Sequence, residues 1–303
     1  MMTEIRFGWV LNAGPARGME ASRFLEIARQ QIALIGEQID SLWFTDHLQF
    51  GSSPVLEGWT ALTYIAALYP QYRIGHMVLC QSFRNPALLA KMGATLQYLG
   101  GGRFLLGIGA GWHEEEYRAY NYPFPEPRAR VEQLEETLQI IRALWNDEQV
   151  TFQGRHYSVH SAYCEPKPEP VPPIIVGGLG TRLLHIVARY ADGWNAAWIK
   201  PDAYRERLAA FERACHQLGR DPTQLQRSWF GRCTCVPSVK EAARLQGRGL
   251  LGTPDQIAEQ LQAYIDLGIT AFMLGSWELE DLQTVELLAR QVLPRFRAGA
   301  SAS

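Results

Sequence analysis

Short apolar runs and longer amphipathic stretches alternate along the whole chain. The short runs are rich in Val, Ile, Phe and Trp, as buried strands are, and the longer stretches repeat apolar positions with helical spacing. The runs predict strands at Ile5–Leu11, Ser41–Phe44, Arg73–Cys80, Phe104–Ala110, Ile174–Val176, Gly193–Ala197, Arg227–Val236 and Ala271–Leu274. The stretches predict helices at Ser22–Gly36, Gly58–Tyr69, Ala87–Leu99, Ala129–Trp145, Thr181–Ala191, Asp202–Leu218, Pro254–Leu267 and Leu279–Phe296. Eight strands alternating with eight helices predict an α/β protein with the (β/α)₈ TIM-barrel architecture.

Helix ends carry their own signals. Thr253 before Pro254, and Asn85 before Pro86, place a capping side chain ahead of a residue that suits the first helical position. Three glycines follow predicted helices, where a left-handed C-terminal residue is common: Gly36, Gly219 and Gly268.

Two connections are longer than a plain barrel needs. After the fourth helix, 150–159 alternates like a pair of strands around Gly154, which predicts a hairpin insertion. After the seventh strand, 237–252 holds a short helical pattern and ends in several glycines. This second insertion is either a mobile lid or a solvated connector.

Composition narrows the protein class. The chain has 303 residues, a net charge of -2 and a pI of about 6.4, so it lacks the basic footprint of a nucleic-acid-binding protein. Barrels of this size form one domain, and we expect a single domain over 1–303. The first ten residues, MMTEIRFGWV, show neither a signal peptide nor a membrane helix, and we expect a cytoplasmic protein that does not bind membranes.

The cysteines and histidines do not predict a metal site. Five cysteines are too few and too scattered for a disulfide scaffold, so we expect free thiols. Cys233 and Cys235 share one face of a strand, but no further ligands follow at zinc spacing. The acidic run after His113 opens a predicted helix, where carboxylates complement the helix dipole. We expect no metal.

In a barrel, the residues that follow each strand line the active site. The second strand ends in Asp46 and His47. An imidazole transfers protons near neutral pH, and a neighbouring carboxylate can orient it, so the pair is a candidate catalytic site. The alternative is structural, with Asp46 capping a turn and His47 packing.

Glycines follow the fourth and fifth strands. The run GIGAGWHEEEY fails the dinucleotide-binding fingerprint because Trp112 stands where the third glycine belongs, but its small residues allow a flat ring to approach the backbone. In GGLGTR, Gly178 and Gly180 precede the helix starting at Thr181, so backbone N–H groups and Arg182 can bind a phosphate. A flexible turn is the alternative for GGLGTR.

Tryptophans also stand at strand ends. We expect the substrate pocket to include Trp9, Trp112 and Trp194, although tryptophan is as often plain packing. Arg182 and Lys200 are expected to make the mouth of the barrel neutral to basic.

Taken together, the strings SLWFTDHLQF, RIGHMVLCQSFRNPALLAKM, FLLGIGAGWHEEEYRAYNYPFP, PPIIVGGLGTR, ARYADGWN and GTPDQIAEQL resemble the luciferase-like monooxygenase superfamily, and particularly its branch of deazaflavin (coenzyme F420)-dependent oxidoreductases. The resemblance covers nearly the whole chain. It implies hydride exchange between coenzyme F420 and a small organic substrate, with FMN-dependent oxygen insertion as the alternative.

The same resemblance assigns residues. It implies that Asp46 and His47 lie beside the cofactor ring, with His47 as the proton donor, and that Met77–Val78 is a non-prolyl cis peptide behind the ring. It implies cofactor contacts at Gly109, Ala110, Gly111, Gly178, Gly180 and Thr181. Trp112 stands where sugar-phosphate dehydrogenases of this branch have a catalytic Glu, which argues against a sugar phosphate. The resemblance also implies a homodimer and a separate cofactor-reducing enzyme as partner.

Two other classes are open to test. A metal-dependent barrel hydrolase places histidines at the end of the first strand, where this chain has Trp9 to Asn12. A non-catalytic flavin-binding paralogue would keep the binding residues and lose the chemistry, and steady-state turnover distinguishes it from an enzyme.

Overall fold

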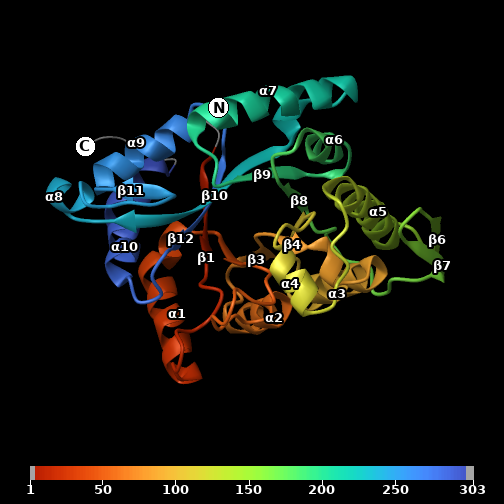
Figure 1. Ribbon diagram of the computed structural model, residues 1–303, viewed down its shortest axis with the longest axis horizontal. Helices are drawn as coiled ribbons and strands as arrows, with labels where there is room; N and C mark the ends of the chain where they lie inside the picture. The colour runs from red at the N-terminus through yellow and green to blue at the C-terminus, as the bar shows by residue number, and fades with distance from the viewer. Residues whose placement is uncertain (1–3, 298–303) are drawn as a thin grey trace.

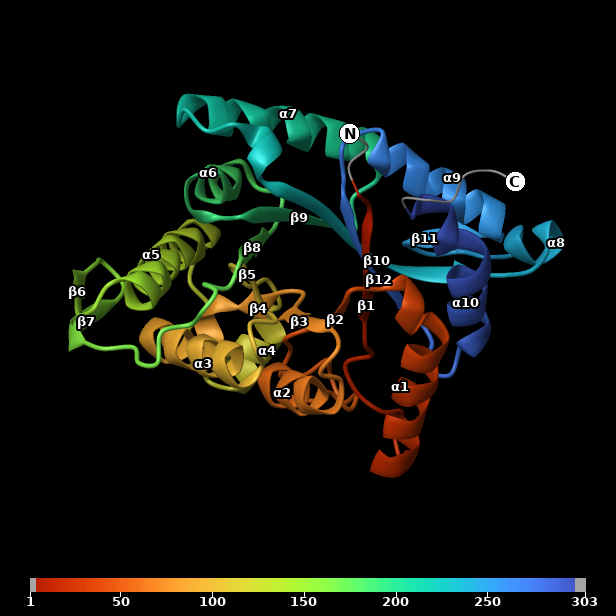
Figure 2. The same cartoon turned by 180° about the vertical axis from the view of Figure 1, so that it is seen from behind.

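The computed structural model describes residues 4–297, so the two ends of the expected domain, 1–3 and 298–303, lie outside the description. Eight parallel strands form a closed barrel (Figures 1 and 2): β1 Arg6–Val10, β2 Ser41–Phe44, β3 Arg73–His76, β5 Phe104–Gly109, β8 Ile174–Gly177, β9 Gly193–Ala197, β10 Gln226–Cys235 and β12 Ala271–Ser276. Pairing of β12 with β1 and of β9 with β10 closes the ring. The predicted barrel is confirmed.

Helices surround the barrel: α1 Ala21–Ile35, α2 Gly58–Leu68, α3 Pro86–Leu99, α5 Pro127–Asn146, α6 Thr181–Tyr190, α7 Pro201–Gln217, α9 Pro254–Ile265 and α10 Leu282–Leu287. The last predicted helix is not continuous. After α10 the chain forms a π turn at Leu288–Val292 and a 3-10 turn at Leu293–Phe296. Pro294 explains the change, because proline lacks an N–H and its ring clashes with the preceding turn.

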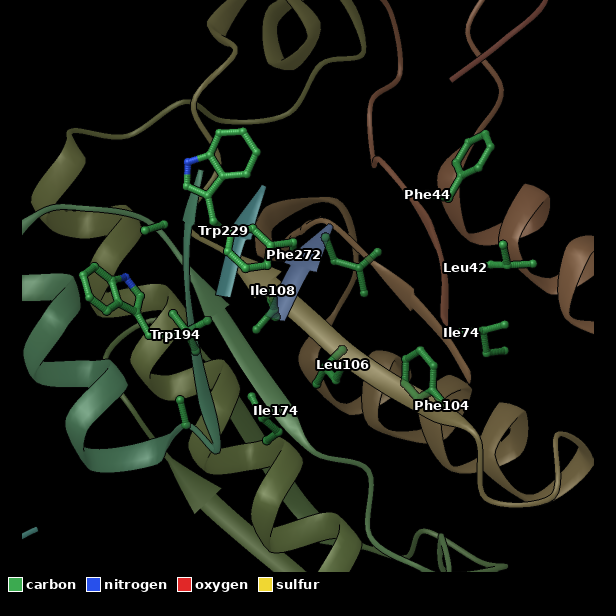
Figure 3. Packing of buried hydrophobic residues seen from close by; sticks show 14 of the residues in the cluster. Leu42, Phe44, Ile74, Phe104, Leu106, Ile108, Ile174, Trp194, Trp229 and Phe272 are labelled. Atoms are coloured by element: carbon green, nitrogen blue, oxygen red, sulfur yellow. The ribbon is translucent and has the colours of Figure 1, made fainter. Parts of the chain in front are cut away.

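Strand side chains alternate between two apolar layers, as the twofold repeat of a strand requires. The layer between strands and helices is the main core, and Figure 3 shows Ile108, Trp194 and Phe272 within it. The smaller layer fills the barrel interior and consists of Val10, Trp43, Met77, Leu105, Ile175, Phe230, Ala271 and Met273. The interior is therefore packed with side chains, as barrel interiors usually are.

Trp43 is the largest interior side chain, and glycines make room for it. Its indole N–H donates to Ser41 Oγ at 2.9 Å. A Cβ built on Gly8 or Gly75 would lie 2.4 Å from an atom of the Trp43 ring. Both neighbouring strands therefore need a residue without a side chain at this level.

The predicted caps are largely confirmed. The Asn85 side chain accepts from two N–H groups of α3, and Thr253 forms a capping box with Gln256 at the start of α9. Gly219 and Gly268 have φ of 65° and 82°, as a left-handed helix end requires. Gly36 is a correction, because it has φ −56° and continues into a 3-10 turn.

Two insertions occupy the expected places. β6 Val150–Gln153 and β7 Ser158–Ala162 pair antiparallel, beside α5 (Figure 1). The segment after β10 forms α8 Val239–Ala242 and then β11 Leu250–Gly252, which pairs parallel with β10. The short helix α4, Glu114–Ala119, and the two-residue strand β4, Leu79–Cys80, complete the elements near the open end of the barrel.

Candidate active site

A cavity of about 750 Å³ lies at the carboxyl ends of the barrel strands, where barrel enzymes have their active sites. Residues within or after all eight barrel strands line it: Ala13; Thr45, Asp46, His47 and Phe50; Met77 to Cys80; Gly111, Trp112 and Glu116; Gly177 to Leu179; Asn195, Ala197 and Trp198; Phe230 and Arg232; and Trp277. Its volume is in the range that binds cofactors and drug-sized ligands.

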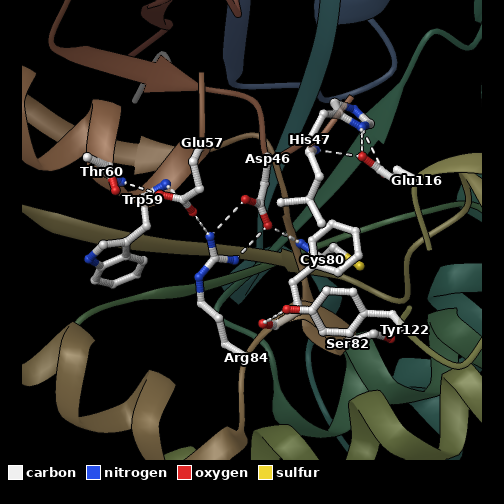
Figure 4. A network of polar contacts seen from close by, with 12 residues as sticks. Asp46, His47, Glu57, Trp59, Thr60, Cys80, Ser82, Arg84, Glu116 and Tyr122 are labelled. Carbon is white, nitrogen blue, oxygen red and sulfur yellow. Dashed lines mark hydrogen bonds and ion pairs between the residues drawn. The ribbon is translucent and has the colours of Figure 1, made fainter. Parts of the chain in front are cut away.

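His47 is held at the wall of this cavity by Glu116 of α4 (Figure 4). The Nδ1 atom lies 3.1 Å from Glu116 Oε1, and the Leu48 N–H donates to Oε2 of the same carboxylate at 2.7 Å. Because a carboxylate accepts hydrogen bonds and does not donate them, Nδ1 carries the proton. Nε2 has no protein partner among the described residues, so it is the atom that can exchange a proton with a ligand.

Aromatic side chains flank the imidazole. The Phe50 and Trp112 rings have their centroids 4.3 and 5.9 Å from that of His47. The Trp112 side chain is 66% exposed, so it forms the rim of the cavity and is free to contact a ligand there. These contacts place a proton-transfer group within an apolar wall.

The sequence suggests Asp46 as a catalytic carboxylate, but its side chain turns to Arg84 and does not bond to His47. Its side chain is fully buried and forms a two-pronged ion pair with Arg84, at 2.8 and 3.0 Å, while accepting from the Cys80 N–H at 2.9 Å. Burial lowers the pKa of Arg84, but the Asp46 hydrogen bonds outweigh that effect and raise it. Both Asp46 oxygens are therefore committed to bonds with Arg84 and Cys80, next to His47 in the chain.

Arg84 extends this network to the next helix (Figure 4). It also pairs with Glu57, whose carboxylate caps α2 by accepting from the N–H groups of Trp59 and Thr60. The Arg84 guanidinium thus joins the end of β2 to the start of α2, and the Asp46 carboxylate joins the same strand end to β4. Sequence reasoning did not single out Arg84, because only the fold brings it beside Asp46.

The Met77–Val78 peptide bond is cis, as the resemblance implies. Val78 projects toward the cavity between two glycines. A Cβ on Gly109 or on Gly177 would lie 2.9 Å from a methyl group of Val78, so those positions are occupied by glycine for reasons of space. Gly109 and Ala110 do not line the cavity, whereas Gly111, with φ 78°, does.

The GGLGTR segment follows β8 and opens α6. Gly178 lines the cavity with φ 141°, and Gly180 is the residue before the first helical residue, Thr181. No side chain caps α6, and a Cβ on Gly180 would meet nothing within 4 Å. The first N–H groups of α6 are therefore uncapped beside open space, which suits an anion.

Two of the predicted pocket residues are corrected. Trp9 is fully buried against α1, and its indole N–H donates to Gln31 at 3.1 Å. Trp194 is also fully buried and stacks on Tyr204 and Phe211 of α7. Both point outward from the barrel because they occupy the helix-facing positions of their strands. Trp194 still contacts the GGLGTR segment, through a 2.8 Å hydrogen bond to the Gly178 carbonyl.

The expected basic mouth is also corrected. Arg182 lies in a surface groove between α5 and α6, and Lys200 is exposed at the start of α7. Neither lines the cavity. The cation that does is Arg232 of β10, which sequence reasoning missed because an arginine inside a strand gives no signal of which face it occupies.

Within residues 4–297, no group of three or more His, Cys, Asp or Glu side chains could hold a metal ion. The five cysteines are free and buried. Over the same residues, every helix is too short or too polar to cross a bilayer.

The chain was compared with known proteins. A family model described as luciferase-like monooxygenase matches residues 5–246. An F420-dependent glucose-6-phosphate dehydrogenase of Kineococcus radiotolerans is 35% identical over 198 residues, which cover 63% of this chain and 58% of that protein, or less than two thirds of its length. An enzyme of the same name from Microbacterium testaceum is 27% identical over 302 residues, covering 85% of this chain and 89% of that protein.

A solved structure has a similar fold. It is an F420-dependent secondary alcohol dehydrogenase in complex with an F420-acetone adduct, and it aligns with a TM-score of 0.84 over 97% of this chain and 100% of that one. At 19% identity, this likeness shows the fold.

Proposed function

Because the chain belongs to the luciferase-like monooxygenase family, we propose that it is an oxidoreductase that binds coenzyme F420 in the barrel cavity. The cofactor supplies hydride exchange with a small organic substrate, and the protein supplies binding, orientation and a proton. Similarity to F420-dependent dehydrogenases along most of the chain supports this choice of cofactor.

One observation carries the proposal: His47, the Met77–Val78 bond and the glycine turn after β8 all open onto the same cavity. The cofactor ring is proposed to lie against Met77, Val78 and Gly111, which line the cavity. Its phosphate is proposed to bind the uncapped N–H groups of α6 near Gly180 and Thr181. Gly109 lies against a methyl group of Val78, and neither Gly109 nor Ala110 lines the cavity.

The residues around His47 define its role. Glu116 fixes the protonated Nδ1, so Nε2 faces the ligand as the proton-donating or proton-accepting atom. Asp46 keeps the end of β2 in place through Arg84 without touching the ligand. Trp112 and Phe50 place apolar rings beside the imidazole at the rim of the cavity.

FMN is the second candidate cofactor, because the matching family is described as a monooxygenase family. The test is a parallel fluorescence titration of the apoprotein with F420 and with FMN, followed by turnover with a panel of alcohols, ketones and enones. Micromolar binding of F420 with hydride exchange supports the proposal. Tighter binding of FMN with oxygen-dependent product reassigns the chain to the monooxygenases, and binding without turnover identifies a non-catalytic paralogue.

His47→Ala tests the site itself. We expect cofactor affinity to stay within about threefold and turnover to fall by about 100-fold or more, the usual contribution of a positioned acid or base. His160 on β7 is exposed and serves as the control, with His160→Ala leaving both quantities unchanged. Turnover that survives in His47→Ala contradicts the assigned role.

We also propose that the chain forms a homodimer through α2 and α3, which lie side by side in Figures 1 and 2. Large exposed apolar residues gather on these helices: Tyr64, Leu68, Leu88, Tyr98 and Leu99. Sedimentation analysis of the wild type and Tyr98→Glu tests it, with dissociation expected in the variant. Five free buried cysteines support a cytoplasmic location, and a separate enzyme that reduces the cofactor is the proposed partner.

A further inference from the structure

The cavity has two halves of different character. The half next to β2, β3, β5 and β8 holds the proposed cofactor contacts and His47. The other half, next to β9, β10 and β12, is lined by Trp198, Phe230, Arg232 and Trp277. The first half is assigned to the cofactor, so the second is where a substrate can meet it.

Arg232 is the distinctive group of this second half. It lies on the interior face of β10, and Nη1 donates to the Ser276 carbonyl at 2.6 Å. Among residues 4–297 no carboxylate lies within ion-pair distance of it, and it is the one lysine or arginine lining the cavity. A guanidinium has five N–H groups, so most of its donors are left for a ligand.

The two carboxylates of the cavity wall do not compensate this charge. Asp46 is taken by Arg84, and Glu116 by His47 and the Leu48 N–H, in the opposite half. Burial lowers the pKa of Arg232 to about 10, which still leaves the group cationic at neutral pH. Arg232 is partly exposed and has no carboxylate partner among the described residues, so a bound anion supplies the missing counter-charge.

Three aromatic rings line the same half of the cavity as the guanidinium. The Trp198 centroid lies 5.2 Å from that of Trp277 and 5.3 Å from that of Phe230. The Trp277 indole N–H donates to the Arg248 carbonyl at 3.0 Å, which ties this wall to the segment after β10. A flat apolar body fits such a wall, and its anionic end would reach the cation.

We propose that the substrate is an organic carboxylate with a flat apolar body, whose carboxylate binds Arg232 and whose body packs against Trp198, Phe230 and Trp277. This inference deepens the proposed function and rests on it for the statement that the bound molecule reacts. Planar, two-pronged pairing between guanidinium and carboxylate fixes the orientation of the molecule as well as its charge.

The test uses phenylacetate and its neutral isostere phenylacetamide as probes, titrated by calorimetry into the whole protein near neutral pH. Wild type is compared with Arg232→Met, Arg232→Lys and the control Arg227→Met. Arg227 is on the same strand at its amino end and does not line the cavity. Wild type is expected to bind the acid about 10- to 100-fold more tightly than the amide, the usual advantage of a charge-assisted pair.

Arg232→Met is expected to remove that preference, Arg232→Lys to restore part of it, and Arg227→Met to leave it intact. Equal affinity for acid and amide in wild type, no binding of either, or an undiminished preference in Arg232→Met each overturns the proposal. So does a parallel loss of F420 or FMN affinity in Arg232→Met, which would assign Arg232 to the cofactor. Carboxylate selectivity in a protein that binds neither cofactor would sink the proposed function and leave the anion site standing.

Discussion

Replacing Arg84 with methionine should be among the most damaging single changes near the site. The Arg84 side chain is 9% exposed and that of Asp46 is fully buried, so the pair is shielded from water. Methionine removes the charge and keeps most of the volume. Asp46 is then left buried with the Cys80 N–H as its remaining partner.

The expected loss in the free energy of unfolding depends on which partners the remaining charged side chain keeps. Removing one member of a buried ion pair costs about 3 to 5 kcal/mol, because the other charge stays buried. Asp46→Asn should cost less, about 1 to 3 kcal/mol, because Arg84 still pairs with Glu57. The double variant should be less damaging than the sum of the single changes by about 1 kcal/mol or more.

Urea unfolding near pH 7.5, followed by tryptophan fluorescence, measures these free energies. Arg118→Met is the matched control, because Arg118 pairs with Glu114 in an exposed position on α4 and should contribute less than about 1 kcal/mol. Two results would show that the ion pair does not hold the end of β2. One is a loss of stability in Arg84→Met no larger than in Arg118→Met, and the other is additive losses for Arg84→Met and Asp46→Asn.

Four further predictions concern the barrel and the cofactor site. His76 is fully buried, and burial lowers its pKa from 6.5 to about 4, so the unfolded chain takes up a proton first as the pH falls. The free energy of unfolding should therefore drop as the pH falls from about 6.5 to 4, by about 2 kcal/mol at pH 5. Urea unfolding of wild type and His76→Phe at about pH 7.5 and 5 measures this, and the variant should lack this part of the pH dependence. Gly107→Ala should cost about 3 kcal/mol or prevent folding, since its Cβ would lie 1.9 Å from the His76 carbonyl oxygen; a normal thermal midpoint would contradict the packing. Thr253→Ala should cost about 1 kcal/mol in the same assay, as a lost helix cap does, with unchanged stability as the opposing result. Gly180→Asp should fold normally and bind cofactor about tenfold more weakly, because the carboxylate repels a phosphate at α6; equal dissociation constants would count against that phosphate site.

Short-range sequence patterns by themselves determined the order of strands and helices in this protein. Strand and helix periodicity, together with caps such as Asn85 and Thr253, were enough to predict the eightfold barrel and its order of elements. His47 was predicted at the site because the rule for barrels depends on strand ends alone, and it lines the cavity. The cis bond at Met77–Val78 followed from resemblance.

The tertiary structure decided what no local pattern encodes, namely which side chains face each other. Trp9 and Trp194 were expected in the pocket and instead face the helices, because the two faces of a strand buried on both sides look alike in sequence. Asp46 is bound by Arg84 because folding brings this residue, 38 positions later in the chain, against it. Arg232 became the cation of the cavity for the same reason: long-range packing, and not the residues beside it, sets the surroundings of a charge.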